Sequence, residues 1–311
     1  MGLPDGGNQL NMQALGKRSM PHKRENLAIY AAPALFVVLW ASGFVGAKFG
    51  MPYVEPLTFL TLRMGAVVFL LAILAFITRP TWPDLAGFKH SIVAGLLVHG
   101  FYLGGVFISI DRRLPAGLSA LVVSLQPVLT STIANRYLGE RVVARQWLGL
   151  ALGISSVYLV VADKTVAGEA TAIGWTAALC ALIAITVGTL YQKRFGGGID
   201  WRAALIIQYS SAGVLFAVGS LLFENQRIEW TIELIGALAW LVLVLSLGAV
   251  WLLYFLIRRT AATRVTSLFY LTPAATALMA WALLGEHLGM LALIGMAVCV
   301  VGVFLVNWRA A

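Results

Sequence analysis

QPVLTSTIANRYLGERVVARQWLGLALGISSVYLV, residues Gln126–Val160, is the stretch that determines the fold, because the chain contains it twice. A shift of 146 residues, without a gap, places it on Thr272–Val306. Each copy has a proline near its start, a Leu-Gly-Glu turn in its middle and a second apolar run with glycines. The coinciding residues include Pro127 with Pro273, Thr130 with Thr276, Leu138-Gly139-Glu140 with Leu284-Gly285-Glu286, and Gly149 with Gly295. In a membrane protein, a doubled half predicts a transporter built of two repeats.

The composition is that of an integral membrane protein. Of the 311 residues, 60% are hydrophobic and only 11% are charged, whereas soluble domains carry about 25% charged residues. The net charge of +9 does not indicate a nucleic-acid partner, because Lys and Arg lie in short segments between apolar runs. Cys180 and Cys299 lie within apolar runs without a set of metal ligands around them. We therefore expect packing roles for both, and neither a metal nor a cofactor.

Ten apolar runs are long enough to cross a bilayer as helices. They span residues 30–49, 57–78, 91–109, 114–137, 144–162, 171–192, 201–223, 234–257, 261–284 and 288–307. Residues 1–28 are polar, and we expect them to form a disordered cytosolic tail. Lys and Arg concentrate on the side of this tail, and the opposite side holds only Lys48, Arg112, Arg113, Lys164 and Arg227. The positive-inside rule therefore predicts that both termini lie in the cytosol.

An odd number of helices in each repeat requires the two repeats to be inverted. The helix at 114–137 and its copy at 261–284 then cross the membrane in opposite directions. We predict an all-α fold of ten transmembrane helices in two inverted five-helix repeats, 29–162 and 171–308. A substrate site is expected at their interface near the membrane midplane. One chain can complete such a cavity, so we expect a monomer whose partners are a small-molecule substrate and the lipid bilayer.

Two prolines at equivalent repeat positions, Pro127 and Pro273, are candidates for hinges. Proline inside a helix removes one backbone hydrogen bond and clashes with the preceding turn. In lipid, the freed carbonyl must find another partner or line a cavity. Paired kinks could therefore shape a central cavity and move, and the alternative is that each is a static kink.

Polar and aromatic side chains within the spans predict the wall of this cavity, because such groups tend to face the bundle interior. The candidate substrate-binding residues are Trp40, Ser42, His99, Tyr102, Gln126, Tyr191, Gln208, Trp251, Tyr254 and Tyr270. Together they suit an uncharged or zwitterionic apolar metabolite. Helix packing is the alternative role for each of them. His99 is either a hydrogen-bonded interior histidine or a proton relay.

Arg63 is the one clear charge inside a predicted span. An intramembrane ion indicates function by default. Arg63 could attract a substrate carboxylate, extend to the outer interface or pair with Glu55. No Asp or Glu lies in the middle of a span, which disfavours a cation-drug antiporter. Uncoupled export fits better, unless His99 couples protons.

The chain resembles the EamA type of the drug/metabolite transporter superfamily. Leu39–Lys48 resembles the opening motif of that family, Pro56–Arg63 resembles the start of its second helix, and the two proline-containing helices that end in Leu-Gly-Glu are its most recognisable feature. The resemblance covers nearly the whole chain after residue 30. It implies ten helices, cytosolic termini, an inverted five-plus-five repeat and transport of small organic metabolites. Within the family, the chain looks most like the amino-acid and metabolite exporters.

We therefore expect an alternating-access exporter of aromatic or neutral amino acids and related small metabolites, uncoupled or gradient-driven, in the bacterial inner membrane. One alternative is a proton-coupled exporter of other metabolites or amphipathic drugs, and another is a pore. The chain contains no His-Glu-x-x-His motif, no Gly-x-Ser-x-Gly motif and no intramembrane Asp pair. An enzyme is therefore not expected.

Overall fold

The computed structural model of the chain describes residues 23–126, 129, 130, 133, 144–161, 170–249, 252, 256, 268–286 and 289–307. Within these residues the chain is helical and contains no strand, apart from an isolated bridge between Val54 and Ile228. The elements are α1 (Lys23–Gly50), η1 (Met51–Tyr53), α2 (Pro56–Thr78), α3 (Leu85–Gly95), η2 (Leu96–Phe101), α4 (Tyr102–Asp111), α5 (Ala116–Val123), α7 (Ala144–Val161), α9 (Ala172–Phe195), α10 (Trp201–Phe223), α11 (Ile232–Ala239), η3 (Trp240–Ala249), η4 (Phe269–Leu271), α14 (Thr272–Leu284) and α15 (Met290–Asn307). Helix α1 begins at Lys23, so residues 23–28, which we expected to belong to a disordered tail, are helical.

Six described helices are long and apolar enough to cross a membrane. They span Ala31–Tyr53, Pro56–Thr78, Leu85–Asp111, Ala172–Phe195, Trp201–Phe223 and Ile232–Ala249. Shorter apolar helices cover Trp147–Ser156, Thr272–Leu284 and Met290–Gly302. These nine segments fall on nine of the ten predicted runs, and α5 lies in the remaining one, 114–137. The count of ten crossings therefore stays a prediction, because parts of five runs lie outside the described residues.

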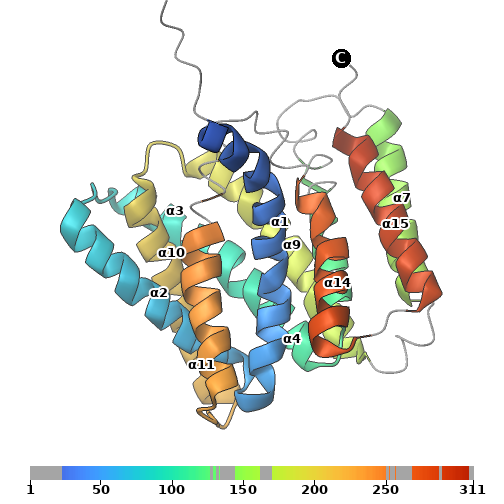
Figure 1. Ribbon diagram of the computed structural model, residues 1–311. Coiled ribbons are helices and arrows are strands. Elements are labelled where there is room, and N and C mark those ends of the chain that lie inside the picture. Colours follow the sequence, from blue (N-terminus) through green and yellow to red (C-terminus); the bar gives the residue numbers. More distant parts are fainter. Residues whose placement is uncertain are drawn as a thin grey trace, which may run out of the picture.

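The helices form a bundle in which α1 occupies the middle (Figure 1). It packs against α14, α11 and η3. Helix α10 packs along α2, and α14 packs against α5. The pair α7 and α15, which ends the two halves of the chain, lies together at one edge of the bundle. In these three pairs, segments from runs that the 146-residue shift relates contact each other.

Local sequence signals explain where several helices begin and end. Pro56 occupies the first turn of α2, where its missing N–H costs nothing. The side chains of Asp84 and Thr171 accept hydrogen bonds from Gly87 N and Gly174 N, which caps α3 and α9. Helix α14 stops at Gly285, whose φ of 65° is left-handed, so the Gly of the second Leu-Gly-Glu motif is a helix C-cap.

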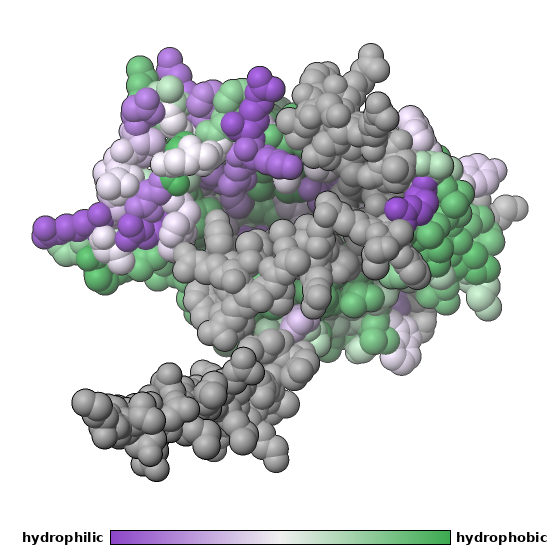
Figure 2. Space-filling model, turned by 90° about the horizontal axis from the view of Figure 1, so that it is seen from above, coloured by the Kyte–Doolittle hydropathy of each residue, from purple (hydrophilic) through white to green (hydrophobic). Residues whose placement is uncertain are grey.

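The two ends of the bundle differ in polarity from its sides. Exposed aromatic and aliphatic side chains such as Phe69, Ile183 and Val214 lie in the middle of long helices, where lipid would surround them. Seen along the bundle, hydrophilic residues gather at the end where α3 and α10 begin (Figure 2). Exposed Lys89 and Lys193 belong to the segments that meet there. We call this the basic end, and the opposite end, where α1 stops, the Lys48 end.

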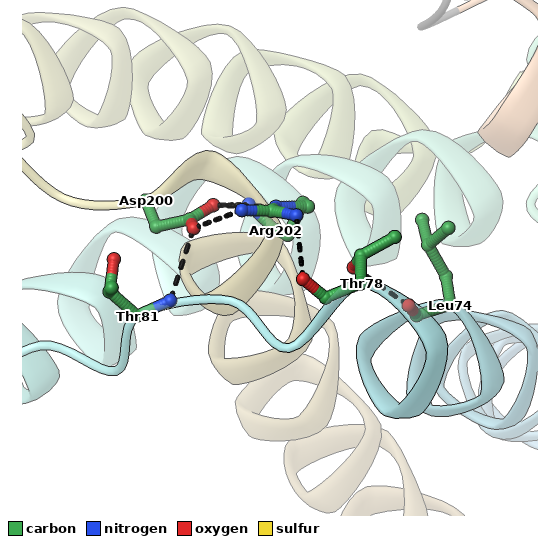
Figure 3. Close-up of polar contacts among 5 residues, drawn as sticks. All are labelled: Leu74, Thr78, Thr81, Asp200 and Arg202. Carbon is green, nitrogen blue, oxygen red and sulfur yellow. Dashed lines mark hydrogen bonds and ion pairs between the residues drawn. The ribbon is translucent and has the colours of Figure 1, made fainter.

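A polar cluster at the basic end ties the last turn of α2 to the first turn of α10 (Figure 3). The Asp200 carboxylate accepts hydrogen bonds from Arg202 Nη2 at 2.6 Å and from Thr81 N at 3.2 Å. Arg202 Nη1 in turn donates to the Thr78 carbonyl at 3.3 Å. Helices α2 and α10, which pack along each other, are therefore also held together by polar contacts at the basic end.

Candidate functional site

A cavity of about 120 Å³ lies inside the bundle, between α1, α2, α4, α9, α10 and the π-helical segments η2 and η3. Its wall is mainly apolar and aromatic, with few polar groups. The lining residues are Trp40, Gly43, Phe44, Arg63, Val98, His99, Tyr102, Leu103, Val106, Phe107, Ile185, Tyr209, Leu245 and Ser246. An apolar chamber with a few convergent polar groups is the usual form of a small-molecule site.

Arg63 is the charged group of this cavity. Its side chain is buried, with 4% of the residue exposed. Arg63 Nη2 donates to Ser246 Oγ at 3.2 Å, while Nε has no partner among the described residues. The Ser246 hydroxyl donates onward to the Leu241 carbonyl at 3.0 Å. Within the described part of the chain, no carboxylate forms an ion pair with Arg63.

Two of the alternatives for Arg63 do not hold. The guanidinium is buried rather than extended to an interface. Glu55 lies at the Lys48 end, where its carboxylate accepts hydrogen bonds from Asn225 N at 2.9 Å and Arg227 N at 3.2 Å. The interaction of Arg63 with a substrate carboxylate is the alternative that remains a proposal.

His99 lies beside Arg63 in the same wall. Its ring stacks on Tyr209, with centroids 4.2 Å apart and an interplanar angle of 25°. His99 belongs to the π-helix η2, and Ser246 belongs to the π-helix η3. π-helical turns within longer helices occur frequently at functional sites. Here they bring side chains from both halves of the chain to one cavity.

The structure places the predicted residues in three groups. Trp40, His99 and Tyr102 line the cavity together with Arg63. Tyr191 and Gln208 instead line a second pocket at the basic end, between α3, α9 and α10. There the Tyr191 hydroxyl and His90 Nδ1 are hydrogen-bonded at 2.7 Å.

Ser42 and Gln126 are described and do not line the cavity. Ser42 accepts a hydrogen bond from Trp240 Nε1 at 2.8 Å and donates to the Leu39 carbonyl, which is a helix-packing role. Gln126 Nε2 donates to Thr189 Oγ1 at 3.2 Å. Trp251, Tyr254, Pro127 and the side chain of Tyr270 lie outside the described residues.

Pro273 lies in the first turn of α14, directly after the 3₁₀ segment η4. We expected it inside a continuous helix, where it would kink the helix. At the start of a helix the missing N–H breaks no intrahelical bond. Pro273 therefore marks a break between two helical segments, and its role as a hinge stays a prediction.

Tyr209 and Ser246 line the cavity but are not among the predicted substrate-binding residues. The repeat itself contains the signal for one of them, since the 146-residue shift carries Arg63 to Tyr209. The same shift carries His99 to Leu245, and all four residues line the cavity. Ser246 has a weaker signal, which is a single hydroxyl within the apolar run 240–249. Equivalent positions of the two halves therefore meet at one chamber.

These features define a class of protein, a multi-pass helical membrane protein with a central chamber. The family model that matches the chain is the EamA-like transporter family, at residues 27–162 and again at 172–308. The chain belongs to this family, and it is a membrane transporter. Its spans and its kinship to inner-membrane transporters make it a multi-pass protein of the inner membrane.

Several curated proteins are similar to the chain over most of its length. The uncharacterized transporter YvbV of Bacillus subtilis is 28% identical over 303 residues, which cover 94% of either chain. The uncharacterized inner membrane transporter YedA of Escherichia coli is 25% identical and covers 91% of this chain. A further Escherichia coli protein, named a probable amino-acid metabolite efflux pump, is 26% identical over 292 residues, or 89% of this chain and 95% of its own.

One solved crystal structure has the same fold. It superimposes with a TM-score of 0.61 and 18% sequence identity, and the match covers 90% of this chain and 96% of that chain. At this identity the likeness concerns the fold alone.

Proposed function

We propose that this protein exports amino acids or related small metabolites by alternating access, without an obligatory coupling ion. The observation that carries the proposal is the central cavity, in which aromatic walls surround one buried cation, Arg63. The related protein named as an amino-acid metabolite efflux pump supports the substrate class. The full architecture that we propose is ten helices in two inverted five-helix repeats, with both termini in the cytosol.

The arrangement of the described helices supports this architecture. Helix α1 begins and α15 ends at the same end of the bundle, the basic end (Figure 1). A basic end is expected on the cytosolic side. Residues that the 146-residue shift relates line one chamber, as expected for a site at the interface of two repeats.

The size of the cavity supports a mechanism that opens and closes. Small-molecule pockets usually measure about 300–1,000 Å³, whereas this cavity measures about 120 Å³. The described state is therefore a compact one, and the helices around the cavity have to separate before most metabolites can enter. In transporters built of repeats, rocking of one repeat or bundle against the other supplies this movement.

The groups in the cavity wall favour uncoupled transport. Ion-coupled carriers commonly hold an acidic residue within the membrane, and no Asp or Glu among the described residues lines this cavity. Among the described lining residues, His99 is the one group with an ordinary pKa near neutrality. Its face is stacked on Tyr209, and this contact suits a packing role.

The test is efflux from liposomes that contain the purified protein and radiolabelled phenylalanine or threonine, with and without an imposed pH gradient. Saturable efflux that does not respond to the gradient is expected. His99→Gln should then transport at a rate close to that of the unaltered protein. Efflux that requires the gradient and is lost in His99→Gln would instead support proton coupling.

A further inference from the structure

The charge balance of the cavity determines which metabolites it can hold. Arg63 carries a positive charge that the guanidinium does not lose in proteins. The residue is 4% exposed, and Nε has no partner among the described residues. A buried cation without a counter-charge is costly, so a negatively charged ligand group would complete this site.

The acidic residues of the described chain are engaged or remote from the cavity. Glu224 accepts hydrogen bonds from the backbone N–H groups of Leu57 and Thr58 at the Lys48 end. Glu286 pairs with Lys48, and Asp200 pairs with Arg202 at the basic end. The described part of the cavity wall therefore offers a cation to a carboxylate, but no carboxylate to an ammonium group.

The rest of the wall fits an apolar ligand body. Trp40, Phe44 and Phe107 contribute aromatic surface to the cavity, and Ile185 and Leu245 contribute aliphatic surface. Around the Arg63 head group, the Ser246 hydroxyl is already engaged on both sides, as acceptor from Arg63 and donor to Leu241. The ligand's charged group therefore meets the guanidinium, while its carbon skeleton meets rings and alkyl groups.

We propose that the preferred substrate is an apolar monocarboxylate anion, such as an aromatic or branched-chain acid without an ammonium group. This inference rests on the proposed function and narrows its substrate class. The carboxylate is the only charge of such an anion, and it pairs with the positive charge of Arg63. An amino acid would satisfy the same guanidinium, but its ammonium group would have no acidic partner in the described wall.

Three compounds that share one phenyl group separate the possibilities. 3-Phenylpropionate carries only a carboxylate, phenylalanine carries both charges, and 2-phenylethylamine carries only an amine. Each radiolabelled compound is loaded into liposomes with the purified full-length protein, and efflux is compared with leak from protein-free liposomes. An interior-negative potential, set with potassium and valinomycin, is imposed in half of the measurements, because it accelerates the exit of an anion and not of a zwitterion.

The expected result is saturable efflux of 3-phenylpropionate that becomes faster under the interior-negative potential. Arg63→Gln should raise the half-saturation concentration about tenfold or more, since a charged hydrogen-bond partner is lost. Arg63→Lys keeps the charge and should retain the dependence on potential. Lys89→Gln removes one exposed positive charge that does not line the cavity, and it should change nothing.

Other outcomes overturn the inference. Efflux of phenylalanine without efflux of 3-phenylpropionate would refute the monocarboxylate preference and leave the amino-acid exporter standing. Efflux of 2-phenylethylamine alone, or of none of the three compounds and not of threonine, would refute both proposals. The response of the unaltered protein to potential decides the question even if Arg63→Gln does not fold.

Discussion

Lys48, near the end of α1, forms an ion pair with Glu286, which follows the C-cap glycine of α14. The backbone N–H of Ala116, at the start of α5, also donates to Glu286 Oε1 at 3.3 Å. One carboxylate therefore holds together three helices from both halves of the chain at the Lys48 end. Its side chain is 8% exposed, and that of Lys48 is 37% exposed. This end of the bundle is closed by a charge contact as well as by packing.

Lys48→Gln should loosen this end of the transporter. A partly exposed ion pair contributes at most about 1 kcal/mol, which corresponds to about a fivefold change in the population of the open state. The measurement uses Val98→Cys, in the cavity wall, as a reporter in a Cys180→Ser, Cys299→Ser background. A membrane-impermeant thiol reagent added at the Lys48 end should label it about fivefold faster in Lys48→Gln. Equal labelling rates with and without Lys48→Gln would show that the pair does not control access.

The opposite effect is expected at Arg194. The 146-residue shift carries Lys48 to Arg194 and Glu286 to Glu140, and Glu140 lies outside the described residues. If the repeats are inverted, Arg194 closes the basic end in the same way that Lys48 closes the Lys48 end. Arg194→Gln should therefore speed labelling of the same reporter from the basic end and slow it from the Lys48 end. Lys193→Gln, its neighbour on α9, is the matched control, and an identical effect of both variants would contradict the equivalence.

The sequence predicts the helices well because their signal is local. Apolar runs of spanning length do not depend on which helices pack together, and proline and glycine mark their ends, as at Pro56 and Gly285. The position of Arg63 within a run was enough to predict an intramembrane charge. The start of α1 is the exception, because residues 23–26 are charged or polar and yet belong to the helix.

The candidate site is harder to predict because it depends on which helix faces meet. Ser42 and His99 are similar as sequence signals, yet Ser42 binds Trp240 while His99 faces the cavity. The π-helical turns of η2 and η3 change which side chains point inward. No residue type in the sequence predicts such turns. Only the internal repeat, which carries Arg63 to Tyr209, relates residues so far apart in sequence.

The cluster around Asp200 predicts a pH-dependent contribution to stability. Hydrogen bonds from the Arg202 side chain hold the pKa of the Asp200 carboxyl well below its usual range. A carboxyl with a lowered folded-state pKa stabilises the fold above its unfolded pKa of about 3.9, and this stabilisation is lost as the pH falls through the folded value. Asp200→Asn should therefore lower Tm at pH 7, and its deficit should shrink as the pH falls below about 4.

Thermal unfolding in detergent between pH 7 and pH 3 measures this difference. Asp84→Asn is the matched control, because asparagine keeps the capping acceptor for Gly87 N and Asp84 forms no described ion pair. Its Tm at pH 7 should stay close to that of the unaltered protein. If the Tm deficit of Asp200→Asn persisted unchanged to pH 3, the ion pair with Arg202 would not be its source.

The close contact between α7 and α15 predicts that Gly302 does not tolerate a side chain. A Cβ added at Gly302 would lie 2.9 Å from the Gly149 carbonyl oxygen and 3.4 Å from Gly153 N. Both neighbours are backbone atoms, which cannot rotate away, so the two helices would have to separate. Gly302→Ala should therefore destabilise the protein by about 1–3 kcal/mol, as overpacking does, and lower its Tm.

Gly236→Ala is the control for this prediction, because nothing lies within 4 Å of a Cβ at this exposed position of α11. Alanine is favoured over glycine inside a helix by about 0.5–1 kcal/mol, so this variant should unfold at the same or a slightly higher temperature. Opposite shifts of Tm for the same substitution would locate the effect in the α7–α15 contact. If Gly302→Ala were as stable as Gly236→Ala, close backbone contact would not be what holds this edge of the bundle.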